Sequence, residues 1–71
     1  MPKSPVLKPD DIARILLGNG FFLDKTKGSH KIFINRELMR RVVVPFHKKD
    51  LPKGTINEII KQSGLSKDKF K

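Results

Sequence analysis

The sequence contains no cysteine, tryptophan or tyrosine. The absence of cysteine excludes the most kinds of functional site. Without cysteine, a disulfide scaffold, a zinc–thiolate site and a thiol nucleophile are all excluded. No apolar run approaches the roughly 20 residues that span a bilayer. No apolar stretch follows Lys3, as a secretory signal would require. We therefore expect a protein of the reduced cytoplasm.

Acidic residues are also few. The 71 residues include 16 Lys and Arg but only seven Asp and Glu, which gives a formal net charge of +9. Such a dense positive field predicts a polyanionic partner: nucleic acid, an anionic membrane surface or an acidic protein. Hydrophobic residues make up 37% of the chain, which favours a folded domain over a disordered one. A chain of this length buries only about 60% of its unfolded surface, so we expect one thin core and no deep substrate cavity.

Two segments have the i, i+3, i+4 apolar spacing of an amphipathic helix. Pro9 suits the first helical position of the earlier segment, and residues 18–20 (Gly-Asn-Gly) provide a stop signal. The later segment begins near Pro52 and ends at Gly64. The apolar positions are Ile12, Ile15 and Leu16 in the first segment and Ile56, Ile59 and Ile60 in the second.

Between the helices, three segments rich in apolar and β-branched residues predict strands: Phe21–Thr26, Ser29–Asn35 and Leu38–Val44. Their short connections favour an antiparallel meander. We therefore expect an α+β fold of order α-β-β-β-α. Two helices cover one face of a three-stranded antiparallel sheet, and the other face is open to solvent or to a partner. Residues 1–8 are expected to form a flexible tail and residues 9–71 a single domain.

Most of the positive charge lies in the sheet and in the loop after it. Residues 25–53 contain two acids and nine basic residues, which leaves a net +7. A charged segment is often only a solvated surface, but this concentration favours binding to a phosphate backbone, which carries no base readout by itself. The nine basic residues are Lys25, Lys27, Lys31, Arg36, Arg40, Arg41, Lys48, Lys49 and Lys53.

All five aromatic residues are phenylalanines. Phe21, Phe22 and Phe33 lie in the strand-like segments, and we interpret them as core residues rather than as a platform on which bases stack. The basic segment therefore predicts contacts to the backbone of a nucleic acid and gives little indication of contacts to its bases.

The catalytic candidate is His30, one of only two histidines. It follows Gly28 and Ser29 at the start of the second strand, and we expect Lys27 and Lys31 to flank its imidazole. A neutral imidazole beside phosphate-binding lysines suits removal of the proton from a ribose 2′-hydroxyl, which then attacks the adjacent phosphate. The cations would stabilise the charge that develops there. A structural or surface histidine is the commoner interpretation of such a position.

Strand alternation creates a conflict for this residue. It puts His30 on the same face as Ile32 and Ile34, which are expected to face the core. Either His30 lies beyond the packed region, or the turn at Gly28 shifts the register. His47, after the third strand, is interpreted as a loop anchor or a phosphate contact, with a second acid/base role as the alternative. Neither histidine has a metal-ligand spacing, so we expect no metal or other cofactor.

Four strings of residues stand in a distinctive order and spacing. They are Gly28–Phe33 (GSHKIF), Val42–His47 (VVVPFH), Leu51–Ile56 (LPKGTI) and Ile59–Ser66 (IIKQSGLS). Each string alone is weak, but together they are specific, and the sequence resembles the HicA (YcfA-like) toxin family. The resemblance covers nearly the whole chain, from about residue 9 to residue 70.

The resemblance implies a fold similar to a double-stranded-RNA-binding domain. It also implies the toxin of a type II toxin–antitoxin system, an mRNA interferase that cleaves RNA without a metal, with a HicB-type antitoxin as partner. The family's catalytic histidine, in its Gly-Ser-His motif, corresponds to His30. Many relatives have a second histidine directly after it, where this chain has Lys31. The residues expected to contact RNA are Lys27, Gly28, Ser29, Lys31, His47, Lys48, Lys49 and Lys53.

Two other functions compete with RNA cleavage. A non-catalytic RNA-binding module of the same shape would contact phosphates and 2′-hydroxyls, but it would not need an imidazole at His30. A small DNA-binding or regulatory protein is disfavoured, because neither helix carries a basic row suited to the major groove. In the second helix, Lys61 stands nearly alone after Lys53.

Overall fold

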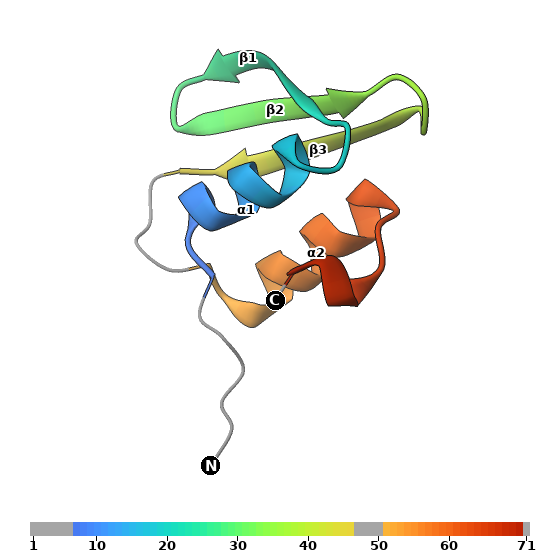
Figure 1. The fold of residues 1–71 in the computed structure, drawn as a ribbon. Coiled ribbons are helices and arrows are strands. Elements are labelled where there is room, and N and C mark those ends of the chain that lie inside the picture. The colour runs from blue at the N-terminus through green and yellow to red at the C-terminus, as the bar shows by residue number, and fades with distance from the viewer. Residues whose placement is uncertain (1–6, 47–50, 71) are drawn as a thin grey trace.

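The computed structural model describes residues 7–46 and 51–70 (Figure 1). Its elements follow the α-β-β-β-α order that the sequence predicts, and a final 3₁₀ turn completes the described part of the chain. The elements are α1 (Pro9–Leu17), β1 (Phe22–Lys27), β2 (His30–Asn35), β3 (Arg40–Pro45), α2 (Lys53–Ser63) and η1 (Lys67–Phe70). The predicted fold class is confirmed.

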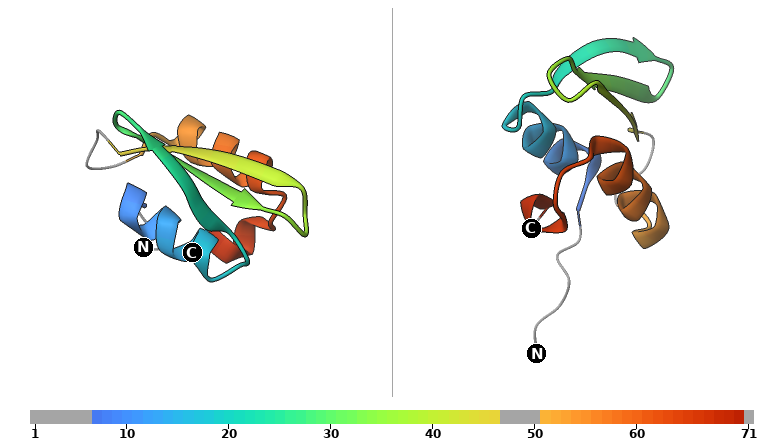
Figure 2. Two further views of the ribbon diagram at one scale, coloured as in Figure 1. Left: turned by 90° about the horizontal axis from the view of Figure 1, so that it is seen from above. Right: turned by 90° about the vertical axis from the view of Figure 1, so that its right-hand side faces the viewer.

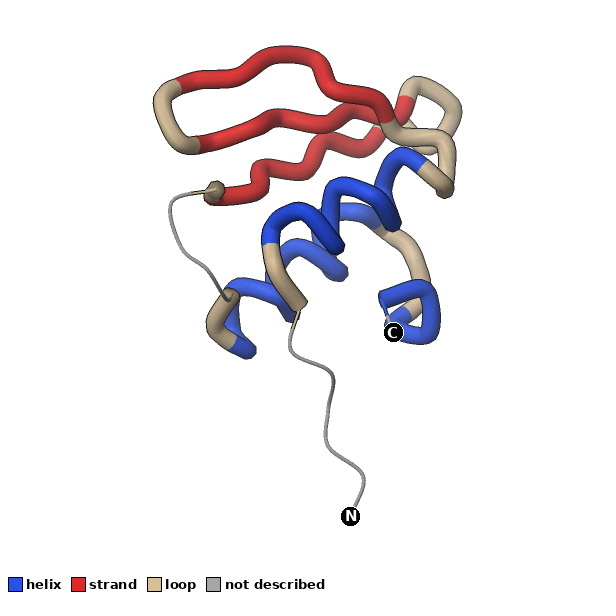
Figure 3. Tube along the Cα trace, turned by 60° about the vertical axis from the view of Figure 1, so that its left-hand side comes forward, coloured by secondary structure: helices blue, strands red, loops and turns tan. Residues whose placement is uncertain are grey.

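The three strands form an antiparallel meander in the order β1-β2-β3. Both helices lie on one side of this sheet, so the molecule has two layers and one sheet face is left without a helix (Figure 2). The β1–β2 turn, the end of β3 and the starts of both helices gather at the same end of the molecule (Figure 3). That end is where the predicted catalytic residue lies.

The first turn of α1 stabilises the start of the helix. Pro9 occupies the first helical position, and the negative charge of Asp11 lies near the positive end of the helix dipole. The Asp11 carboxylate also accepts a hydrogen bond from the Lys8 backbone N–H at 3.0 Å. After the helix, Gly18 keeps a right-handed conformation, whereas Gly20 has a φ of 89°. The left-handed stop predicted for residues 18–20 is therefore Gly20.

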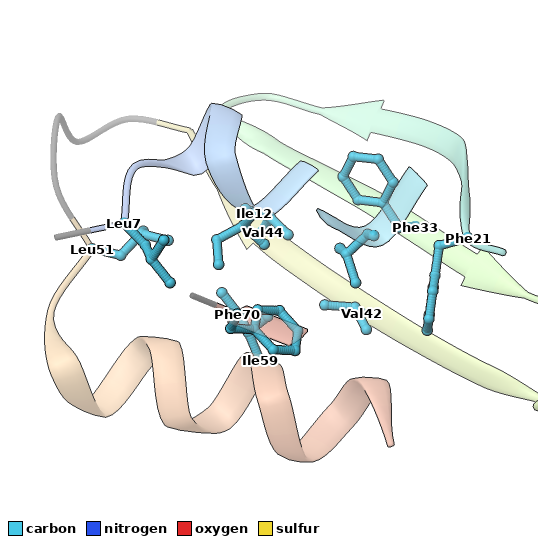
Figure 4. Close-up of a cluster of buried hydrophobic side chains, with 10 residues drawn as sticks. Leu7, Ile12, Phe21, Phe33, Val42, Val44, Leu51, Ile59 and Phe70 are labelled. Carbon is cyan, nitrogen blue, oxygen red and sulfur yellow. The ribbon is translucent and has the colours of Figure 1, made fainter. Parts of the chain in front are cut away.

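The core lies between the helices and the inner face of the sheet (Figure 4). Its buried members are Leu7, Ile12, Leu16, Phe21, Phe33, Val42, Val44, Leu51, Ile59 and Phe70. Leu7 was expected to belong to the flexible tail, yet its carbonyl accepts a hydrogen bond from the Leu51 N–H at 3.2 Å. Burial of its side chain removes apolar surface from water. Packing therefore begins at least two residues before Pro9, the expected start of the domain.

A buried asparagine links the end of α1 to the turn between β2 and β3. The Asn35 side chain donates a hydrogen bond from Nδ2 to the Asn19 carbonyl at 3.2 Å. Its Oδ1 accepts one from the Leu38 N–H at 2.9 Å. A buried amide left without partners would cost about 1–3 kcal/mol, so these bonds stabilise this corner of the fold.

The third strand begins later than the sequence predicted. Leu38 and Met39 lie in a four-residue turn, which the cross-strand pair Asn35 and Arg40 closes. Met39 has a φ of 56°, outside the range of a strand residue. Both apolar side chains are exposed to solvent. Because both side chains are hydrophobic, the sequence predicts a strand that starts two residues too early. The left-handed conformation of Met39 makes the two residues part of a turn instead.

Candidate nucleic-acid interface

His30 opens β2 directly after a two-residue turn. Gly28 and Ser29 form the turn, and Lys27 and His30 close it as a cross-strand pair. Gly28 has a φ of 60° in the first central position, where a type II′ turn requires glycine. A Cβ there would meet nothing within 4 Å, so the backbone conformation, and not crowding, requires glycine. The Ser29 carbonyl accepts a hydrogen bond from the Phe46 N–H at 2.6 Å, which fastens the turn to the end of β3.

The register of β2 and β3 determines which way His30 points. Val42 and Val44 belong to the core, so Val43 between them points away from the helices. Val43 pairs directly with Ile32, which therefore points away as well. His30 lies two residues before Ile32 on the same strand. We call this side of the sheet, which faces away from the helices, the outer face.

The expectation that Ile32 and Ile34 face the core is therefore wrong. Phe33 is the core residue of this part of β2, and Ile32 is buried without belonging to the core cluster. The apolar run Ile-Phe-Ile gives no alternation from which the inner residue could be chosen. Once Phe33 is assigned to the core, the conflict over the orientation of His30 disappears.

Three cross-strand rows make up the outer face. They are Lys27–His30–Pro45, Lys25–Ile32–Val43 and Phe22–Ile34–Arg41. All residues from 22 to 30 are exposed, as is Arg41. The outer face therefore combines one histidine, three cationic side chains and a central strip of apolar ones.

A β-bulge brings both lysines to this face. Leu23 pairs with the core residue Phe33, whereas Lys25 pairs with Ile32, and the register skips Asp24 between them. A shift of one residue moves every later side chain of a strand to the opposite face. Because of the bulge, Lys25 and Lys27 lie on the side of His30 instead of on the inner side.

Lys31 does not share the outer face with its neighbour His30. It pairs with Thr26 on one side and with the core residue Val44 on the other. Its Nζ lies 4.3 Å from the centroid of the Phe46 ring, within the range of a cation–π interaction. The prediction that lysines flank the imidazole on both sides is therefore wrong for Lys31, because adjacent strand residues point to opposite faces.

The other predicted contact residues are only partly brought together. Gly28 and Ser29 lie in the exposed turn beside His30. Lys53 is exposed at the first position of α2 and so belongs to the helical layer. Three further predicted contacts, His47, Lys48 and Lys49, lie outside the described residues.

The outer face includes residues that were not assigned to the site from the sequence. The sequence places Lys25 and Arg41 only in the basic segment, and its prediction that Phe22 is a core residue is wrong, because Phe22 pairs with Ile34 on the outer face. Phe22 is 41% exposed, and the Arg36 guanidinium carbon lies 5.7 Å from its ring centroid. Whether these three residues lie on the outer face depends on the bulge and on the cross-strand register. The sequence holds no local signal for either.

This geometry provides a proton-transfer group beside fixed positive charge. Imidazole exchanges a proton near neutral pH, and lysine ammonium groups attract phosphate. The Cβ atoms of directly opposite strand residues lie about 5 Å apart, so Lys27 can hold a phosphate that His30 reaches. Within residues 7–46 and 51–70, no group of three or more His, Cys, Asp or Glu side chains could hold a metal ion. No helix among these residues is long and apolar enough to cross a membrane.

Fold and site together define a small, basic α+β domain with a histidine on an uncovered sheet face. Residues 9–65 match the family model described as HicA toxin of bacterial toxin-antitoxin. The chain therefore belongs to the HicA toxin family, and the resemblance drawn from its sequence is confirmed. A comparison with curated proteins finds no match. Membership of this family makes the protein the toxin of a toxin–antitoxin pair, with a cognate antitoxin as its partner.

Proposed function

We propose that this toxin is an RNA endonuclease that uses His30 for proton transfer and needs no metal ion. The observation that carries the proposal is the pairing of His30 with Lys27 across an exposed turn, one row from Lys25. A general base and two cations then lie on a sheet face that no helix covers. An extended polyanion can reach all three groups without entering a cavity.

The reaction is an internal transesterification. His30 removes the proton from a ribose 2′-hydroxyl, and the 2′-oxygen attacks the adjacent phosphorus. The new bond joins the 2′-oxygen to phosphorus, and the bond from phosphorus to the 5′-oxygen breaks. The leaving oxygen takes up a proton, and the products carry a 2′,3′-cyclic phosphate and a 5′-hydroxyl. Because the substrate supplies its own nucleophile, no metal-bound water is required.

The two lysines of the hairpin stabilise the phosphate as its charge increases. Lys27 lies directly opposite His30, and Lys25 follows in the next row. Fixed charges that are aimed at the reacting group commonly contribute a large part of a rate enhancement. Both lysines stand on β1, paired with β2, so their Cα positions relative to His30 are set before RNA binds.

The test compares a labelled RNA with the same RNA carrying a 2′-deoxyribose at the cleaved position. We expect the first to be cut and the second to resist, with a cyclic phosphate on the upstream product. We also expect the rate to persist in excess EDTA. Cleavage of the deoxy substrate at that bond, or loss of activity in EDTA with recovery on adding a divalent ion, would contradict the mechanism.

A second candidate function is a non-catalytic RNA-binding module. The basic outer face favours it independently, because phosphate contacts from Lys25, Lys27 and Arg41 need no imidazole. The two functions differ in what the toxin does to bound RNA. A module would protect RNA or block translation and leave the strand intact, whereas the endonuclease yields discrete ends.

We further propose that the antitoxin is of the HicB type and that the toxin acts on mRNA in the cytoplasm. An acidic antitoxin would complement the net charge of +9. The site lies on an open sheet face of a small domain, so an external protein can cover it directly. The antitoxin would then compete with RNA for the same lysines.

A further inference from the structure

We propose that Phe22 and Arg36 form a subsite for one RNA base, at the end of the outer face away from His30. This inference rests on the proposed RNA endonuclease function and adds a specific contact to it. The catalytic hairpin would hold the cleaved phosphate, and the subsite would hold the base of a nearby nucleotide. The toxin would then have a contact through which the RNA around the cleavage position affects binding.

The first observation is the exposure of the Phe22 ring. Phe21 and Phe33 are 3% and 2% exposed, as expected of core residues, whereas Phe22 is 41% exposed. Phe22 pairs with Ile34, so its ring lies on the outer face and not against the helices. Burial in the core therefore gives no reason for an aromatic residue here, and an exposed ring on a basic face is what base stacking uses.

The second observation is the position of Arg36. Its guanidinium carbon lies 5.7 Å from the Phe22 ring centroid, and Arg36 is itself exposed in the turn after β2. A base between two flat groups needs about twice the 3.4 Å step of stacked nucleotides, so the gap would widen by roughly an ångström. An exposed arginine side chain can make that movement. Guanidinium planes stack on bases as aromatic rings do.

The third observation is the path between the subsite and His30. Phe22 belongs to the Ile34 row, and Ile34 is four residues from His30 along β2. At about 3.3 Å per residue the two rows are about 13 Å apart, a distance that a few nucleotides of extended RNA can span. Lys25 lies in the row between them and can contact an intervening phosphate, and Arg41 adds a second cation at the subsite end, in the row of Phe22. The charge of this path favours a nucleic acid over an apolar protein segment as the occupant.

The experiment measures binding of RNAs that contain one abasic nucleotide. A cleaved RNA is first mapped with the wild-type toxin, and its cleaved ribose is then replaced by 2′-deoxyribose to prevent cutting. A series of such RNAs carries the abasic nucleotide at successive positions on either side of that ribose. Dissociation constants are measured for wild type, Phe22→Leu, Arg36→Lys and Leu23→Ala, with thermal unfolding as a check of folding.

We expect one abasic position, a few nucleotides from the cleaved bond, to weaken wild-type binding by at least about fivefold, the lower end of what a stacked base contributes. Phe22→Leu should weaken binding to intact RNA by a similar factor. On the RNA that is abasic at this position, Phe22→Leu should bind no more weakly than wild type does. Arg36→Lys keeps the charge but lacks the planar group, so it should show part of the same pattern. Leu23→Ala is the matched control: Leu23 is 45% exposed on the same strand but pairs with the core residue Phe33.

Two results would overturn the subsite while leaving the endonuclease intact. One is wild-type affinity and cleavage in Phe22→Leu. The other is equal loss in Phe22→Leu on intact RNA and on every abasic RNA, because a stacking partner must show position dependence. A wild-type toxin that neither binds nor cleaves RNA would overturn the proposed function and the subsite together. Weakened antitoxin binding by Phe22→Leu with unchanged RNA binding would assign the ring to the protein partner instead.

Discussion

Lys27 and His30 face each other across the turn between β1 and β2, on the sheet face that neither helix covers. Lys27 reaches this face only because the register skips Asp24, whereas Lys31, the neighbour of His30 in sequence, points to the opposite face. The cation beside the imidazole is therefore supplied by strand pairing, and not by sequence proximity.

The first prediction concerns two glycines with positive φ. Alanine at position 28 would be strained by about 1–2 kcal/mol without a clash, because φ is 60° and the surrounding space is open. Gly20→Ala should lower the free energy of unfolding by more, since φ is 89° and the new Cβ would lie 3.0 Å from the Asn35 amide nitrogen. Displacement of that amide would weaken its hydrogen bond to Asn19 and remove roughly a further 1 kcal/mol.

Thermal unfolding of both variants measures this difference. In a domain of this size each kcal/mol lowers Tm by about 4–8 °C. Gly28→Ala should therefore remain folded with a modestly lowered Tm, and Gly20→Ala should unfold several degrees lower still. Equal losses, or a larger loss in Gly28→Ala, would show that the hydrogen bond from Asn35 to Asn19 does not stabilise the corner between the end of α1 and the β2–β3 turn.

The second prediction concerns salt. For single-stranded nucleic acid, log affinity falls with log salt by about 0.7 per phosphate contact. Removing the two lysine charges with Lys25→Gln and Lys27→Gln together should reduce the slope by about 1.4 and weaken all RNA sequences alike. Lys61→Gln is the matched control, because it removes one exposed lysine from α2 in the helical layer.

Binding titrations across a range of salt concentrations give these slopes. An unchanged slope in the Lys25 and Lys27 double variant would mean that the outer face is only a solvated surface. An equal change in Lys61→Gln would show that net charge matters and that its position does not. Charge reversal of Lys48 and Lys49, expected from the sequence to weaken binding to all RNAs, can be measured in the same series.

The third prediction concerns the antitoxin. If it covers the outer face, RNA and antitoxin exclude each other, and added antitoxin should displace labelled RNA even from the inactive His30→Ala toxin. Association should slow as salt rises, because complementary charge accelerates the encounter of the two proteins. A competition titration with uncleaved RNA measures the displacement. A stable complex of toxin, antitoxin and RNA at saturating antitoxin would require inhibition at a distance instead.

Element type and order could be predicted from the sequence, since they depend on local signals. Pro9 and Gly64 mark a helix start and a helix end, and both act as expected: Pro9 is the first helical residue, and Gly64 takes the left-handed conformation with a φ of 73°. The apolar spacing of the two helices fixes which of their sides is buried. Each of these features depends on only a few neighbouring residues, so the α-β-β-β-α order could be predicted from the sequence.

Which residues make up the site was harder to predict from the sequence than the order of the elements. In β2, the run Ile32, Phe33 and Ile34 is apolar throughout, so alternation cannot identify the residue that enters the core. In β1, the bulge at Asp24 changes which side chains face outward, and strand pairing alone determines its position. The histidine can be identified from its motif. That Lys25 and Phe22 lie exposed on the outer face can be known only from the strand register.

The most direct test of the account is the effect of His30→Ala on cleavage when RNA binding is measured in parallel. We expect the cleavage rate to fall by a factor on the order of 10² to 10⁴, the usual contribution of a general acid or base. Because His30 is exposed at a strand end, Tm should change little, and affinity for a 2′-deoxy-blocked RNA should stay close to wild type. A folded His30→Ala toxin that cleaves RNA at the wild-type rate would contradict the central claim.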